Sequence, residues 1–251
     1  MAGANRRRRR RMDRGYLYRF LSLVIICGCV IAALTLFFRV KRIEISGNLL
    51  YQDREIQQAA GVSDGNNMFF LNKYAMAERV TRELPYIEQA RISRDLPDTL
   101  HIDVLECRYP LAIVQDGGAW LISPSGKIVD RVTEERTFPL ITGCDPLSPS
   151  VGTPLALAEA DAERQSSLIA LLTALREAEM LEKVGGVHLE NNSYLVMDYD
   201  GRFTVRLPYG ADYPRKLRTL VSAIEDEKIQ DGMRGLFDLT RERETYFRLE
   251  H

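Results

Sequence analysis

The stretch from Phe20 to Phe38 constrains this chain most, because it holds 19 residues without a single charge. As an α-helix with a rise of 1.5 Å per residue it would reach about 28 Å, close to the thickness of a bilayer's hydrocarbon core. We therefore predict a transmembrane helix over residues 20–38. The competing interpretation is a cleaved signal peptide, whose apolar region usually holds about 7 to 15 residues. The longer apolar core, which continues with bulky residues after Ala32 and Ala33, favours a retained anchor.

The charges on either side of this stretch predict its orientation. Residues 1–19 carry eight Arg against one acid, Asp13, for a formal charge of +7, whereas Arg39, Lys41 and Arg42 are the basic residues just after the stretch. By the positive-inside rule, residues 1–19 form a basic cytoplasmic tail and everything after Arg39 lies outside the cytoplasm. Since the whole chain sums to −1, the remainder carries −8. This acidic part offers no broad basic surface for nucleic acid.

A first folded region is predicted over residues 39–107. Residues 40–46 alternate as a half-buried strand, and two helices follow at about 53–61 and 74–83. Two further strands, at about 87–94 and 100–104, are joined by a tight connection at Leu96-Pro-Asp-Thr99. The order β-α-α-β-β defines a small α+β domain.

A second folded region is predicted over residues 108–251. It begins with strands, including a hairpin at 119–129, and continues with a helix within about 158–183 that the pair Gly185-Gly186 would stop. Strands follow at about 187–189, 193–199 and 202–207, with Asp200-Gly201 as a hairpin turn. A second helix at about 212–227 precedes extended segments at 235–240 and 245–249. The region is therefore mixed and β-rich, with two helices.

An ordered set of residues in the first region, in register with the apolar stretch, carries a family resemblance. The set is Val40, Ile43, Ile45, Gly47-Asn48, Glu55-Ile56, Ala60-Gly61, Gly65, Asn67 to Phe69, Leu84-Pro85, Ile87, Ala90, Ile92, Arg94, Leu96 to Leu100, Ile102 and Val104. With these residues the first region resembles a POTRA domain that follows a membrane anchor, as in the FtsQ/DivIB family of bacterial cell division proteins. The similarity continues through residues 106–112, 119–129 and 138–143, which resemble the start of the family's second, β-rich domain. Where that family usually has an acidic residue in the hairpin turn, this chain has Ser123-Pro124-Ser125.

The sequence lacks the motifs of the common hydrolases and nucleotide-binding proteins. Gly-x-Ser-x-Gly, Ser-x-x-Lys, His-Glu-x-x-His and Gly-x-x-x-x-Gly-Lys are all absent. The three histidines, His101, His188 and His251, have no partners at a spacing typical of a general base or a metal site. We therefore predict no catalytic residue, no cofactor and no metal, and a protein that is not an enzyme.

Two cysteines, Cys107 and Cys144, follow the apolar stretch and would face an oxidising compartment. A disulfide between them is one reading and two free thiols the other. Nothing in the sequence fixes the roughly 5.5 Å separation of Cα atoms that a bridge requires.

The resemblance also implies where partners bind. In the FtsQ/DivIB family the C-terminal strand region binds the small coiled-coil division proteins FtsB or DivIC together with FtsL, and binding by strand addition needs an accessible sheet edge. We expect Tyr246 and Arg248 to face a partner from the side opposite Phe247. Phe237, Leu239 and Phe247 can instead fill the core, because alternate strand residues face inward. The predicted contact residues are Phe237, Leu239, Arg241, Tyr246, Phe247 and Arg248.

The predicted function is that of a single-pass, non-enzymatic scaffold of the division machinery at the septum, with its folded regions on the outer face of the cytoplasmic membrane. One rival is a POTRA-containing secretion or transport accessory protein, which would normally show several POTRA repeats or a following β-barrel. The other is a cell-wall enzyme, against which the missing catalytic motifs argue.

Overall fold

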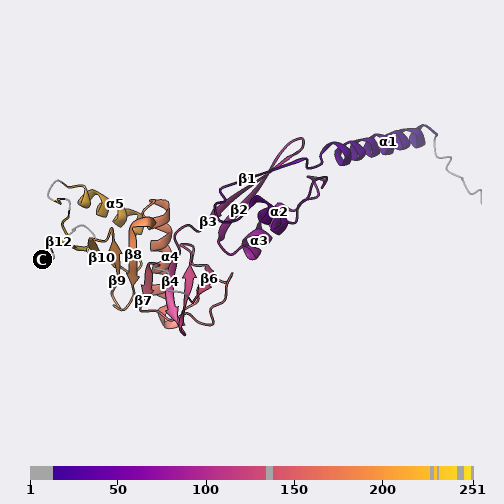
Figure 1. The fold of residues 1–251 in the computed structure, drawn as a ribbon. Coiled ribbons are helices and arrows are strands. Elements are labelled where there is room, and N and C mark those ends of the chain that lie inside the picture. The colour runs from indigo at the N-terminus through magenta and orange to yellow at the C-terminus, as the bar shows by residue number, and fades with distance from the viewer. Residues whose placement is uncertain (1–13, 134–137, 227–228, 231, 242–245, 250–251) are drawn as a thin grey trace, which may run out of the picture.

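The protein is elongated, with an apolar helix at one end and a short strand at the other (Figure 1). The computed structural model describes residues 14–133, 138–226, 229–230, 232–241 and 246–249. Between the helix and the last strand lie two folded parts, each with its own sheet and core. The predicted α+β class is confirmed: an apolar helix, a small β-α-α-β-β unit and a mixed β-rich unit with two helices.

The N-terminal helix, α1 (Arg14–Phe37), contains one stretch long and apolar enough to cross a membrane, Tyr18–Thr35. None of that stretch is buried against the rest of the protein. A helix that is apolar and leaves its side chains uncovered fits a membrane anchor. The prediction of a basic cytoplasmic tail over residues 1–19 falls largely on residues 1–13, which lie outside the described part of the chain.

The first folded part has the predicted order of elements, with a three-stranded sheet in the order β1-β3-β2. The strand β1 runs parallel to β3, and β2 runs antiparallel to it. Two helices cover the sheet and bury an apolar core that includes Ile56, Val80 and Ile102. The elements are β1 (Arg42–Ser46), α2 (Asp53–Ala60), α3 (Lys73–Glu83), β2 (Ile87–Asp95) and β3 (Thr99–Glu106).

The second folded part is a nine-stranded sheet in the order β12-β11-β10-β9-β8-β7-β4-β5-β6, with two helices packed on it. Its core joins leucines of both helices to alternate residues of the central strands. The elements are β4 (Leu111–Gln115), β5 (Gly118–Ile122), β6 (Ile128–Val132), β7 (Leu140–Thr142), the short 3-10 turn η1 (Glu159–Asp161), α4 (Ala162–Glu177), the turn η2 (Leu181–Lys183), β8 (Val184–His188), β9 (Tyr194–Tyr199), β10 (Phe203–Pro208), α5 (Tyr213–Ile224), β11 (Gly235–Asp238) and β12 (Tyr246–Leu249).

Local signals placed most of these elements correctly. The turn between β9 and β10 is the predicted one, with Asp200 and Gly201 both at positive φ (56° and 63°), as a two-residue hairpin requires. At the start of α5, the Asp212 carboxylate accepts a hydrogen bond from the Arg215 backbone N–H at 3.1 Å. Such an N-cap satisfies a donor that the helix leaves unpaired.

The predicted stop of the first helix at Gly185-Gly186 is wrong. The helix α4 already ends at Glu177, and Glu179 provides the left-handed turn at φ 56°. Gly185 and Gly186 lie inside β8, where a Cβ on Gly186 would come within 3.1 Å of the Leu140 carbonyl oxygen on β7. Gly186 therefore serves close strand packing, and neither glycine ends the helix.

The two folded parts are joined by a small apolar cluster and by polar contacts. The Tyr86 hydroxyl donates to Asp130 at 3.1 Å, and the Lys127 ammonium donates to the backbone carbonyls of Thr81 and, at 3.2 Å, Ile87. Arg176 on α4 pairs with Glu88 on β2, whose side chain is only 1% exposed. The domain boundary predicted at residues 107 and 108 falls in the connection between β3 and β4 and stays a prediction.

Burial is the main influence on the pKa of Glu88 at this junction. It raises the pKa of Glu88 above the ordinary range of a glutamate, although Arg176 lowers it. A carboxylate enclosed in this way depends on its cation, because a buried charge without a partner is costly. The junction is therefore held by a polar pair as well as by apolar contact.

A candidate partner-binding strand edge

The strand β12 forms one edge of the nine-stranded sheet and lies at the end of the molecule opposite α1 (Figure 1). It pairs antiparallel with β11, in a register that places Phe247 opposite Phe237 and Tyr246 opposite Asp238. Within the described residues no strand pairs with its other side. An edge of this kind presents backbone groups that a further strand can use.

The hydrogen bonds of β11 fix which backbone groups of β12 face outward. The N–H groups of Gly235 and Leu239 both donate toward β10, to Arg202 and Arg206 carbonyls at 3.2 and 3.0 Å. Because backbone groups alternate in direction along a strand, Leu236 and Asp238 face β12. Their register partners Arg248 and Tyr246 therefore bond inward.

Phe247 lies between these inward-bonding residues, and Leu249 lies just beyond them. The N–H and C=O groups of Phe247 and Leu249 therefore face the outer side of β12. A partner strand laid along this edge would pair with these two residues. We call the outer side of β12 the open edge from here on.

The side chains of the predicted contact set fall into two groups. Phe237 and Leu239 are fully buried in the core. Phe247 is partly buried, with its ring centroid 4.8 Å from that of Phe237. Tyr246 is 50% exposed, and Arg248 on the same face is exposed as well. The expected alternation around Phe247 is thus present, whereas Phe237 and Leu239 can influence a partner only by holding β11 in place.

The last residue of the set, Arg241, follows β11 and is exposed. Its guanidinium lies over the Tyr246 ring, 5.2 Å from the centroid, and donates to the Tyr246 hydroxyl at 3.3 Å. Arg241 and Tyr246 therefore form one surface feature at the start of β12. That any of the six residues contacts a partner stays a prediction.

Two residues that the sequence analysis missed position this edge. Lys216 on α5 donates through its ammonium to the carbonyls of Leu239 and Arg241 at 2.7 and 2.5 Å, which ties the end of β11 to the helix. Gly235 leaves room for the Phe247 ring and the Arg248 carbonyl, which a Cβ there would approach to 2.7 and 2.5 Å. A glycine at the start of a strand was the only available signal, and no pattern indicated Lys216.

The end of β11 is fixed by Asp238. Its carboxylate accepts hydrogen bonds from the Thr240 backbone N–H at 3.0 Å and from the Thr240 hydroxyl at 2.6 Å. Burial raises the pKa of Asp238, but these bonds and the nearby Arg206 and Arg241 outweigh it and leave the pKa below its ordinary value. Asp238 is therefore ionised and bonded at neutral pH, and it shapes the turn from which Arg241 projects.

A hydroxyl, an imidazole and a carboxylate meet on the strands β7 to β9. The Thr142 hydroxyl lies 2.8 Å from His188 Nδ1, and His188 Nε2 lies 2.9 Å from the Asp198 carboxylate. The Thr142 hydroxyl, however, donates to Glu190 at 2.5 Å, a bond that lowers the pKa of Glu190. Since that proton goes to a carboxylate, His188 is not placed to activate the hydroxyl, and the group is a cross-strand network.

The cysteines follow the free-thiol reading. Cys107 and Cys144 do not form a disulfide. Cys107 is buried and Cys144 is partly buried. Burial raises the pKa of Cys144 to about 12 and that of Cys107 further. Neither thiol is therefore reactive at neutral pH. Among the described residues, no group of three His, Cys, Asp or Glu side chains is placed to hold a metal ion.

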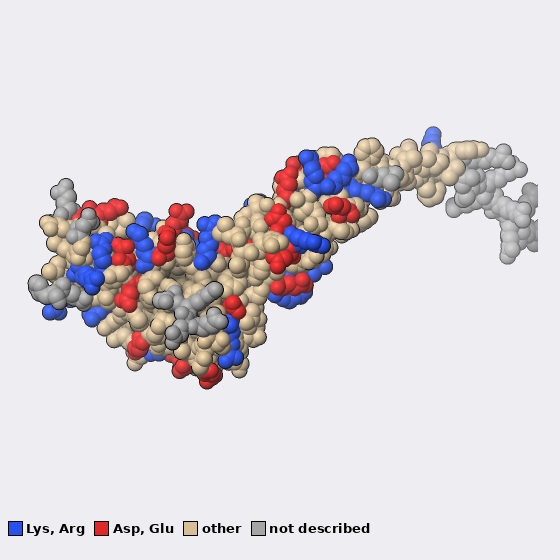
Figure 2. All heavy atoms as spheres, viewed as in Figure 1, with Lys and Arg blue, Asp and Glu red and all other residues tan. Residues whose placement is uncertain are grey.

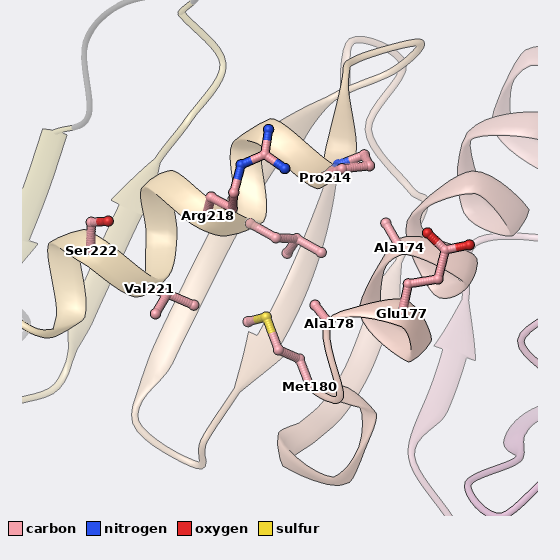
Figure 3. A pocket seen from close by; sticks show the side chains of 9 residues that line it. Ala174, Glu177, Ala178, Met180, Pro214, Arg218, Val221 and Ser222 are labelled. Carbon is pink, nitrogen blue, oxygen red and sulfur yellow. The ribbon is translucent and has the colours of Figure 1, made fainter.

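An open hollow of about 520 Å³ lies between α4 and α5 (Figure 3). Its lining is mostly aliphatic, from Ala174, Met180, Leu217 and Val221, with Glu177 and Arg218 among its few polar side chains. Aliphatic walls with so few polar groups suit contact with apolar surface rather than acid–base chemistry.

Two family models match the chain over most of its length. The POTRA domain of FtsQ type matches residues 38–106, and the C-terminal domain of cell division protein FtsQ/DivIB matches residues 112–240. These matches define a cell division protein with a single POTRA domain next to its apolar helix. The chain belongs to the FtsQ/DivIB family.

Curated relatives agree with this assignment. The cell division protein FtsQ of Geotalea daltonii is 28% identical over 230 residues, which cover 87% of this chain and 80% of the relative. The cell division protein DivIB of Clostridium botulinum strain Hall is 23% identical over 236 residues, which cover 93% and 90%. The C-terminal family match ends at residue 240, before β12. The strand β12, with its open edge, therefore lies outside the matched residues.

Proposed function

We propose that this protein is a membrane-anchored, non-enzymatic scaffold of the divisome. The helix α1 holds it in the cytoplasmic membrane with residues 1–19 in the cytoplasm, and the two folded parts stand on the outer face at the division septum. The open edge of β12 takes up a strand of a small coiled-coil division protein of the FtsB/DivIC type, together with its FtsL-type companion. No small-molecule substrate, cofactor or nucleic acid takes part.

The observation that carries the proposal is the direction of the backbone groups on β12. Phe247 and Leu249 turn their N–H and C=O groups to an edge that no described strand occupies, next to the exposed side chains Tyr246 and Arg248. Strand addition gains affinity from main-chain hydrogen bonds and specificity from such side chains. Tyr and Arg are also enriched among the residues that dominate binding energy.

Family membership supports the choice of partner class. The relatives are cell division proteins, which makes division proteins the first candidates for the open edge. The elongated shape places β12 far from the base of α1 (Figure 1), where a membrane-anchored partner with a long helix can reach it. The fold thus separates the anchor from the binding strand.

The experiment is capture of candidate FtsB/DivIC-type and FtsL-type partners by the full chain in detergent or nanodiscs. Leu249→Pro removes one outward N–H and leaves the inward bonds of β12, which Tyr246 and Arg248 make. Proline is tolerated on an edge strand where its missing N–H faces outward. Leu249→Ala is the matched control, because it shortens the exposed side chain and keeps the N–H. The pair Tyr246→Ala and Arg248→Ala tests the side-chain contribution.

We expect Leu249→Pro to weaken capture by about five- to thirtyfold, as the loss of about one to two kcal/mol of hydrogen bonding implies. Leu249→Ala should bind nearly as the unmodified protein does. Equal capture by Leu249→Pro and Leu249→Ala would move the interface away from the open edge. Undiminished capture by folded Tyr246→Ala and Arg248→Ala variants would remove those residues from the interface.

A further inference from the structure

Three aromatic side chains stand exposed within six residues of the first folded part. Phe69 is 46% exposed, Phe70 is 79% exposed and Tyr74 is 83% exposed, although Met68 beside them is fully buried. Single exposed apolar residues are ordinary, but a contiguous apolar patch marks a contact surface. We call Phe69, Phe70 and Tyr74 the aromatic patch.

The loop that carries Phe69 and Phe70 is bonded to the end of α1, and Tyr74 lies in the first turn of α3. The Asn67 side-chain amide donates to the carbonyls of Leu34 and Thr35 at 3.2 and 3.3 Å, and the Met68 backbone N–H donates to the Phe38 carbonyl at 2.9 Å. The last carbonyls of a helix have no partner within the helix, and in a membrane they cannot be left unpaired. The loop therefore completes the end of the apolar helix.

Ring contacts continue this attachment. The rings of Phe38 and Phe69 meet edge to face, with centroids 5.0 Å apart and an interplanar angle of 81°. Phe37, at the end of α1, is exposed as well. Aromatic side chains from the helix end and from the loop thus form one group around the point where α1 leaves the folded part.

The position of this group along α1 sets its depth. The uncharged stretch ends at Phe38, whose ring meets that of Phe69, and the charged Arg39 follows directly. A bilayer's polar headgroup layers begin at the end of its hydrocarbon core and are several Å thick. The aromatic patch therefore lies at headgroup depth on the outer side, where amphipathic rings are favoured.

Charge at the same place fits a headgroup layer. Arg39, Lys41 and Arg42 follow α1 directly and are exposed, although Asp98 pairs with Lys41 and Arg42 at 3.3 and 3.7 Å. The acid Asp64 is also exposed on the loop. Figure 2 shows Lys and Arg side chains gathered on the first folded part near the base of α1. Cations beside exposed rings suit a phospholipid surface, where the cations meet phosphates and the rings meet the upper acyl chains.

We propose that Phe69, Phe70 and Tyr74 insert into the outer leaflet beside α1 and hold the POTRA domain against the membrane. The inference rests on the membrane anchoring proposed above. With Asn67 fixed to α1 and the patch fixed in lipid, the first folded part has two attachments to the bilayer instead of one hinge. The tilt of the whole elongated molecule, and so the position of β12 above the membrane, then follows from this contact.

The test places a single tryptophan at chosen sites of the full chain in lipid nanodiscs that contain brominated phospholipids. Trp120 is the only tryptophan of the chain, so a Trp120→Phe background is silent. Phe70→Trp and Tyr74→Trp report on the patch, and both sites are so exposed that the larger ring fits. Leu50→Trp is the matched exposed control at the far end of the same domain, where the Leu50 N–H bonds the Glu106 carboxylate. Ile26→Trp in α1 reports on anchoring itself.

We expect bromine quenching and a blue-shifted emission for the two patch probes, close to those of the Ile26→Trp probe, and neither for Leu50→Trp. Patch probes that match Leu50→Trp while Ile26→Trp is quenched would overturn the inference and leave the anchor intact. Unquenched Ile26→Trp would overturn both proposals. Patch probes that become shielded only when another division protein is added would show a protein rather than lipid on the patch, and would also overturn the inference.

Discussion

The two edges of the nine-stranded sheet, β6 and β12, differ in the pairing of their outward backbone groups. At the β6 edge, the Ile128 backbone N–H donates to the Thr153 carbonyl and its carbonyl accepts from Gly152, both at 2.8 Å. A side chain of the same strand, Asp130, accepts from Tyr86 of the first folded part. At the β12 edge, no described residue pairs with the outward groups of Phe247 and Leu249.

Within the described residues, the second folded part pairs the start of its β6 edge at Ile128 with its own chain and leaves the outer side of β12 without a strand partner. Uncovered edges invite aggregation, so folded proteins usually cover, shorten or charge them. The open edge is short and carries the charged Arg248, and both features disfavour aggregation. Its outward backbone N–H and C=O groups still remain available to a further strand. An edge kept open beside one that is closed is what a strand-adding scaffold requires.

The largest expected effect is a loss of stability at the junction between the two folded parts. Arg176→Ala leaves the Glu88 carboxylate buried without its cation, and the free energy of unfolding should fall by about 3 to 5 kcal/mol. Chemical denaturation of the full chain in detergent measures it. The double variant Glu88→Gln with Arg176→Met is the control and should recover most of the loss. An unaltered unfolding midpoint for Arg176→Ala would contradict the role given to this pair.

A second change disturbs the open edge without substituting a residue of the predicted contact set. Gly235→Ala forces a Cβ against the Phe247 ring and the Arg248 carbonyl, and such overpacking costs about 1 to 3 kcal/mol. We expect faster hydrogen exchange at the Tyr246 and Arg248 amides and weaker partner capture. Gly185→Ala in β8 is the matched control, because its Cβ would meet only ordinary contacts from 3.4 Å outward. Equal effects of the two substitutions would show that β12 is not held in this way.

A third, smaller change loosens the support of the open edge. Lys216→Met removes two hydrogen bonds to carbonyls after β11, and because the ammonium is partly exposed to solvent we expect a net loss of about 1 kcal/mol. Exchange at β12 should rise while the first folded part stays unchanged. Arg215→Met, one residue earlier on α5, should leave β12 exchange as it is. Identical exchange profiles for the two variants would assign Lys216 no positioning role.

The smallest expected effect is a pH dependence of stability that comes from Glu88 at the same junction. Because the pKa of Glu88 is raised in the folded protein, the folded state binds more protons than the unfolded chain above about pH 4.3, the ordinary value for glutamate. The contribution of Glu88 to stability is therefore full below that pH and is lost as the pH rises through the folded pKa. Relative to Glu88→Gln, the unmodified protein should lose stability with rising pH in this window. Parallel pH curves would contradict it.

The sequence predicted the helices and strands better than the tertiary contacts that position them. The β-α-α-β-β unit and the Asp200-Gly201 hairpin follow from alternation and turn residues, which are local signals. Gly185 and Gly186 were misassigned because both lie inside β8, where Gly186 allows the close approach of β7, and only the tertiary fold reveals this. For the same reason Lys216 and Gly235 went unnoticed. Strand alternation favoured Tyr246 and Arg248 as outward-facing residues, but only the structure shows that Phe237 and Leu239 are fully buried. The direction of backbone groups on β12 depends on register across three strands.

The most direct test of the account is amide hydrogen exchange at the four residues of β12, with and without an FtsB/DivIC-type partner. The account predicts that Tyr246 and Arg248, which bond inward to β11, are protected in both states. Phe247 and Leu249 should exchange quickly alone and become protected when the partner binds. A complex that forms while Phe247 and Leu249 still exchange quickly would contradict strand addition at the open edge.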